Sequence, residues 1–146
     1  MINEFEFYHG AVISRILHSS KNEIFILKIN DLDNASYVLN NKTALYIKHS
    51  TKRLSPWRFS FQIEHIKQIQ NLSKSYNSVF AVLVCKDDGI VALNLDQLKV
   101  LLNFENPDSS QSIALDRNKG GFYGVNGSLN SLKNKISLNN FPSVLI

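Results

Sequence analysis

The chain has little of several features that stabilise or target other proteins. Its 146 residues include a single cysteine, Cys85, so an internal disulfide bond is excluded. No run of about 18 apolar residues occurs, which excludes a membrane-spanning helix of ordinary length. The first six residues contain two acids and lack the basic stretch and apolar run of a secretory signal. These absences predict a cytoplasmic protein.

Size and composition nevertheless suit one hydrophobic core. The hydrophobic content of 44% and the charged content of 19% are ordinary for a globular domain. A chain of this length buries about two thirds of the surface that its unfolded form exposes, so it needs neither disulfides nor a structural metal. The polar run 103–111 is too short to link two domains. We therefore expect one domain over residues 1–146, with a core at about 7–103 and a C-terminal hairpin extension at about 111–146.

Carboxylates are missing from residues 34–63, a stretch of 30 residues that contains five basic side chains. The remainder of the chain has 11 bases and 12 acids, so the net charge of +4 arises within this stretch. A cationic field with a defined location favours a polyanionic partner, such as nucleic acid. A second interpretation is that these basic side chains are only the solvated surface of a hairpin and bind no partner. The five basic residues are Lys42, Lys48, Lys52, Arg53 and Arg58.

Hydrophobic periodicity and turn residues predict a mixed α/β (α+β) fold. Asn40 and Asn41 tolerate the positive φ of a tight hairpin, and the apolar run that ends at Cys85 is typical of a strand inside a covered sheet. The expected elements are a helix at 7–18, strands at 23–29, 36–39 and 43–49, a stiff connector at 54–59, a helix at 61–73 capped by Ser60, strands at 78–85 and 90–93, a short helix at 95–102, and a hairpin with strands at 112–115 and 122–125.

The order helix, three strands, helix, strand over residues 7–85 resembles the αβββαβ, restriction-endonuclease-like core of the PD-(D/E)xK nuclease-like superfamily. In that family, an acid on the second strand and a (D/E)-x-K tripeptide on the third strand hold a divalent metal. Tyr46-Ile47-Lys48 stands in the place of the tripeptide, and only its lysine matches. The resemblance implies that Lys48 and Asp33 are catalytic and that Asp33 binds Mg²⁺. However, the hairpin pairs Tyr46 with about Ser36, so Asp33 lies three residues further along, which weakens chelation.

A second resemblance covers most of the chain. Residues 47–50, 55–61 and 79–90 look like segments of a group of bacterial proteins with no established activity. No function can be carried over from this group.

Charge and resemblance together lead to three functional hypotheses. The first is a nucleic-acid-binding domain without a cofactor, with DNA favoured, in which Trp57 stacks on a base or sugar and the phosphates are bound by Lys42, Lys52, Arg53 and Arg58. The second is a Mg²⁺-dependent nuclease that uses Lys48 and Asp33. The third is a protein-interaction module of a bacterial defence or mobile-element system. Structural alternatives stay open, because Trp57 could instead pin its loop to the core and Lys48 could protect an edge strand.

The sequence predicts no zinc site, no cysteine nucleophile and no calcium loop. The four histidines lack the short HxH or HExxH spacings of zinc sites. Cys85 ends a buried strand, where it is a small hydrophobic residue rather than a nucleophile. Asp87-Asp88-Gly89 is a turn without the remaining ligands of a calcium loop. An exposed hairpin and a buried strand are compatible with a symmetric homodimer.

Overall fold

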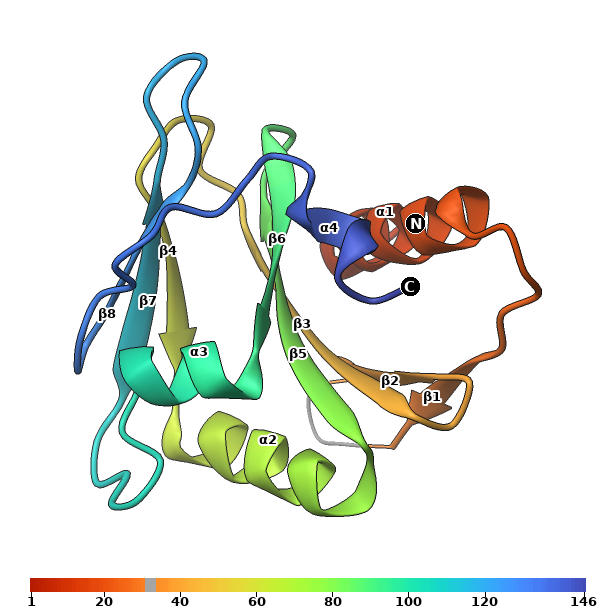
Figure 1. Ribbon diagram of the computed structural model, residues 1–146, viewed down its shortest axis with the longest axis horizontal. Helices are drawn as coiled ribbons and strands as arrows, with labels where there is room; N and C mark the ends of the chain where they lie inside the picture. The colour runs from red at the N-terminus through yellow and green to blue at the C-terminus, as the bar shows by residue number, and fades with distance from the viewer. Residues whose placement is uncertain (31–33) are drawn as a thin grey trace.

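Two β-sheets form the centre of the computed structural model, which describes residues 1–30 and 34–146 (Figure 1). The five-stranded sheet contains, in spatial order, β1 (Ile26–Ile29), β2 (Ser36–Leu39), β3 (Thr43–Ser50), β5 (Ser78–Cys85) and β6 (Gly89–Asn94). The three-stranded sheet contains β4 (Trp57–Phe61), β7 (Gln111–Asp116) and β8 (Gly124–Gly127). Strands β3 and β5 are parallel, because helix α2 (Ile63–Ser75) returns the chain between them, and the other pairs are antiparallel. The chain therefore has the α+β fold that its sequence predicts.

Different elements cover the two faces of the five-stranded sheet (Figure 1). On one face, Ile16 of α1 (Glu4–Ser19) packs in a core cluster with Ile47 of β3 and with α4 (Asn140–Ser143). On the other face, Tyr46 packs in a cluster with α2, α3 (Leu95–Leu101) and the three-stranded sheet. Because side chains alternate along a strand, Lys48 lies on the same face of β3 as Tyr46. None of the described helices has the length and apolar composition needed to cross a membrane.

The main difference from the sequence-based expectation is at residues 54–62. The predicted stiff connector is wrong from Trp57 onward, because Trp57–Phe61 forms β4 and pairs with β7. Ser60 does not cap a helix, since it lies on an exposed position of β4, and α2 follows its N-cap Gln62. Buried and exposed residues alternate along β4. This period of two was the strand signal in the sequence.

Both predicted hairpins form. The φ angles of Asn40 and Asn41 are 51° and 58°, and the register of the first hairpin pairs Ser36 with Tyr46 as expected. β7 and β8 form the predicted C-terminal hairpin, but this hairpin is no separate extension, because β7 also pairs with β4. The Asn and Asp side chains of residues 30–34 also predict a turn, and residues 31–33 of it lie outside the described residues.

Candidate functional site

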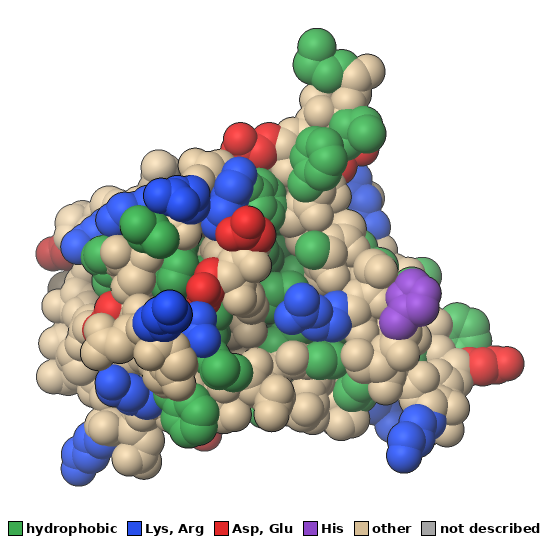
Figure 2. All heavy atoms as spheres, turned by 90° about the horizontal axis from the view of Figure 1, so that it is seen from above, with side chains coloured by type: hydrophobic (Ala, Val, Ile, Leu, Met, Phe, Trp, Pro, Cys, Tyr) green, Lys and Arg blue, Asp and Glu red, His purple; other side chains and the backbone are tan. Residues whose placement is uncertain are grey.

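Three loops meet at the end of β3 that leads to Lys52 and Arg53. The carbonyl oxygen of Ser50 accepts a hydrogen bond of 3.0 Å from the backbone N–H of Lys86, in the turn between β5 and β6. The Oγ atom of Ser55 accepts one of 2.9 Å from the backbone N–H of Arg117, in the loop between β7 and β8. Figure 2 views the molecule from the side of these loops and shows basic side chains interspersed with acidic ones. We call Lys52, Arg53, Lys86 and Lys119, all exposed, the loop-end cations.

The predicted phosphate-binding residues do not all belong to this end. Lys42 lies in the turn before β3, whereas Lys52 and Arg53 follow β3, so about 25 Å of extended chain separates them. The structure therefore does not bring Lys42 together with Lys52 and Arg53, and its predicted phosphate contact stays a prediction. Arg58 is exposed on β4, where its Nη1 donates a hydrogen bond of 3.2 Å to Ser112 Oγ.

Trp57 is placed in the core. It is 2% exposed, and its indole Nε1–H donates a hydrogen bond of 2.8 Å to the carbonyl oxygen of Lys52. A buried indole has no accessible face on which a base could stack. Trp57 therefore pins the loop of Lys52 and Arg53 to the core, and its predicted role as a nucleic-acid contact is corrected.

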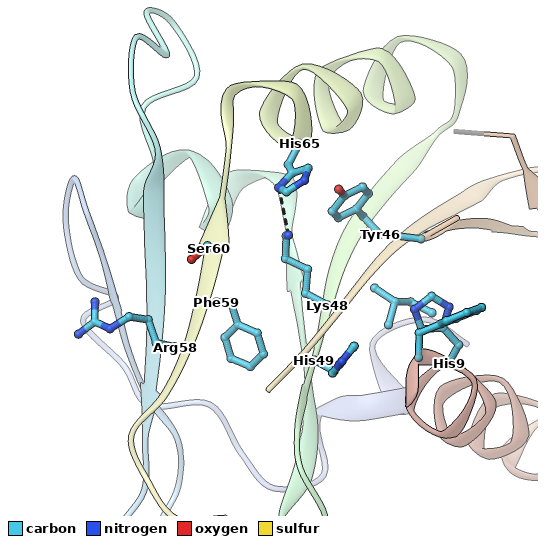
Figure 3. Close-up of a pocket in the computed structure, with 11 residues that line it drawn as sticks. His9, Tyr46, Lys48, His49, Arg58, Phe59, Ser60 and His65 are labelled. Atoms are coloured by element: carbon cyan, nitrogen blue, oxygen red, sulfur yellow. Dashed lines mark hydrogen bonds between the residues drawn. The ribbon is translucent and has the colours of Figure 1, made fainter. Parts of the chain in front are cut away.

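A cleft of about 420 Å³ lies on another part of the surface, lined by residues of α1, β3, β4 and the first turn of α2. Figure 3 shows Lys48 of β3 pointing toward His65 of α2, with Phe59 and Tyr46 on either side. Arg58 points away from Lys48. His9 and His49 also line the cleft. Of these residues, only Lys48 and Arg58 are candidate functional residues predicted from the sequence.

The Lys48 ammonium is held by the imidazole of His65. Lys48 Nζ lies 3.1 Å from His65 Nδ1, and the backbone N–H of Gln62 also donates to Nδ1, at 3.1 Å. Because both groups donate, Nδ1 is an acceptor, and the neutral ring has its proton on Nε2. Lys48 Nζ also lies 5.0 Å from the ring centroid of Phe61, within the range of a cation–π contact. β3 pairs with β2 only over Thr43–Tyr46, whereas its pairing with β5 includes Lys48, so Lys48 lies beyond the β2 register and its role at a strand edge stays a prediction.

The other two histidines of the cleft attach α1 to the sheet. His49 Nε2–H donates to Glu4 Oε1 at 3.2 Å, and its ring stacks on Tyr8 with centroids 4.3 Å apart. His9 is 6% exposed, and its Nδ1 lies 2.9 Å from the hydroxyl oxygen of Tyr37. These contacts hold the first turns of α1 against β2 and β3.

The described residues do not fit a metal site beside Lys48. Within residues 1–30 and 34–146, no three His, Cys, Asp or Glu side chains gather so as to hold a metal ion. Mg²⁺ requires oxygen ligands, usually carboxylates. Asp33, the predicted catalytic acid and metal ligand, lies outside the described residues.

Cys85 ends β5 as a fully buried residue. Burial, and to a smaller extent the charge of Asp88, raises the pKa of its thiol well above the usual value. A buried and protonated thiol is a poor nucleophile. The interpretation of Cys85 as a small hydrophobic residue is therefore confirmed.

The chain was compared with protein-family models, with curated proteins and with solved structures, and none of them matches. The superfamily suggested by the order of helices and strands stays a prediction. The structure defines the class of protein as a mixed α+β domain with a basic loop end and a cleft that contains a lysine.

Proposed function

We propose that this chain binds nucleic acid, with DNA as the favoured polymer, through the loop-end cations. The observation that supports this most directly is the pair of hydrogen bonds that bring three loops together, from Lys86 to Ser50 and from Arg117 to Ser55. They gather basic residues from three distant parts of the sequence at one end of the molecule. Exposed lysines and arginines that neutralise phosphates supply the sequence-independent part of nucleic-acid affinity.

Acids at the same end reduce this positive charge without cancelling it. The three loops, residues 51–56, 86–88 and 116–123, contain five cations and three acids. One acid, Asp88, accepts a hydrogen bond from Arg117 at 3.0 Å, so this pair is already neutralised within the protein. The surplus is small, and we therefore expect a modest affinity that depends strongly on salt.

Replacing both Lys52 and Arg53 by alanine should weaken binding to duplex DNA and flatten its salt dependence. Each lost phosphate contact changes the slope of log K against log salt by about 0.9, so two lost contacts change it by about 1.8. Fluorescence anisotropy of a labelled duplex between about 50 and 200 mM salt measures this slope. Lys42→Ala is the matched control, because it removes one charge at the other end of β3 and should leave the slope unchanged.

Undetectable binding would contradict this proposal, as would equal slopes for the double variant and the wild type. The interaction-module hypothesis would then become the one to test. A pull-down of an acidic protein partner that persists after nuclease treatment would support that hypothesis.

A Mg²⁺-dependent nuclease is a second candidate function, favoured by the position of Lys48. Lys48 lies on the third strand and lines a cleft, and β3 is parallel to β5. An αβββαβ order is obtained only if β4, which precedes α2 and belongs to the other sheet, is set aside. If Lys48 and Asp33 are catalytic, digestion of DNA or RNA with Mg²⁺ or Mn²⁺ should be lost in Lys48→Ala and in Asp33→Ala. Digestion that persists in both variants would reject this assignment.

A further inference from the structure

The cleft that contains Lys48 has the size of a site for one small ligand. Its volume of about 420 Å³ falls in the range of about 300–1,000 Å³ that is typical of small-molecule sites. A base inside a duplex is stacked and paired, so it reaches a pocket of this kind only after it leaves the stack. If the cleft binds a part of a nucleic acid, that part is an unpaired nucleotide.

The cleft also has an exposed aromatic side chain, Phe5 of α1. Phe5 is 40% exposed, whereas Tyr46 and Phe59, which line the same cleft, are 1% and 2% exposed. The Phe5 ring makes an edge contact with the ring of His9, with centroids 5.2 Å apart. His9 is itself buried and bonded to Tyr37. Phe5 is therefore a supported aromatic surface of the kind on which single-stranded bases stack.

A held cation lines the same cleft. Lys48 Nζ lies 3.1 Å from His65 Nδ1, which positions the ammonium. His65 lies in the first turn of α2, where the positive end of the helix dipole also favours an anion. Phe5 and Lys48 line the same cleft from different faces of the five-stranded sheet, so a ligand that contacts both must reach from α1 to the Lys48 side of β3.

We infer that the cleft binds one unpaired nucleotide of a single-stranded nucleic acid, with its base on Phe5 and its phosphate at Lys48. His65 is then a positioning residue that holds the Lys48 ammonium. This inference rests on the proposed function and adds to it a preference for single strands over duplexes.

The test compares anisotropy of a labelled single strand and of the corresponding duplex at one salt concentration. Phe5→Ala should weaken single-strand binding about 5- to 150-fold, the range for loss of one base–aromatic stack. Its effect on duplex binding should be small. Phe7→Ala is the matched control, because Phe7 is another exposed phenylalanine of α1 that lines a different groove. Phe7→Ala should leave binding of both polymers unchanged.

Variants at Lys48 and His65 test the phosphate contact. Lys48→Met should weaken single-strand binding, and Lys42→Met should not. His65→Asn places an acceptor near the position of Nδ1, so it should keep the bonds from Lys48 and Gln62 and bind like the wild type. His65→Leu removes that acceptor and should bind like Lys48→Met, with circular dichroism to check that it folds.

The outcomes separate the cleft from the loop-end cations. Equal binding of single strand and duplex, with no effect of Phe5→Ala or Lys48→Met, would overturn the inference and leave the proposed function intact. Single-strand binding that depends on Phe5 and Lys48 but not on Lys52 and Arg53 would support the cleft and reject the loop-end site. Binding of neither polymer would reject both.

Discussion

Asp88→Ala should destabilise the protein by about 3 kcal/mol, because it leaves two largely buried donors without their acceptor. Asp88 Oδ2 accepts a hydrogen bond of 2.6 Å from the hydroxyl of Tyr123, and Oδ1 accepts one of 3.0 Å from Arg117 Nη1. Tyr123 is 2% exposed, and the Arg117 side chain is 21% exposed. Urea denaturation measures the loss, which corresponds to a fall in Tm of roughly 10 °C for a chain of this size.

Asp87→Ala is the matched control for this prediction. Asp87 lies in the same turn, has the same charge and is exposed. Exposed substitutions of this kind usually change stability by no more than about 0.5 kcal/mol. If both substitutions had the same effect, the charge of the turn rather than the two bonds of Asp88 would stabilise the native state.

The bonds of Asp88 also explain how the loop-end cations are arranged. Asp88 in the β5–β6 turn holds Arg117 in the β7–β8 loop, and the backbone N–H of Arg117 donates to Ser55 in the loop of Lys52 and Arg53. The loops that provide the cations are therefore joined by polar bonds. Such ordering reduces the entropy that binding would otherwise cost.

Elements with local sequence signals were predictable. Asn40 and Asn41 specify the first hairpin because they adopt positive φ, and its register follows from the turn. The apolar run at 78–85 gave the bounds of β5, since a strand covered on both faces needs apolar side chains in succession. These signals require no knowledge of distant residues.

Elements that depend on distant partners were not predictable in the same way. β4 pairs with β7, about 50 residues further along, and the preceding proline suggested a connector instead. Lys86 and Lys119 come from segments in which acids and bases balance, so a search for charge along the sequence does not find them. His65 holds Lys48 across two different elements, and neither residue belongs to a spacing motif with the other.

Gly127→Ala should destabilise the protein by roughly 3 kcal/mol, because an added methyl group would overlap backbone rather than a movable side chain. A Cβ at Gly127 would lie 2.6 Å from Leu101 Cα, at the end of α3, and closer still to the Leu101 carbonyl oxygen. That oxygen accepts a hydrogen bond of 2.9 Å from the backbone N–H of Leu129, which holds the two segments together. The free energy of unfolding in urea measures this effect.

Gly10→Ala makes the same chemical change, but it should raise the free energy of unfolding rather than lower it. Gly10 lies inside α1, and a Cβ there would meet no atom within 4 Å. Alanine in an exposed helix interior is more favourable than glycine by about 0.5–1 kcal/mol, because the unfolded chain loses less backbone entropy on folding. Gly10→Ala should therefore stabilise the protein. A neutral result for Gly127→Ala would mean that the end of β8 can move away from α3, and the close packing of these two elements would then not constrain the fold.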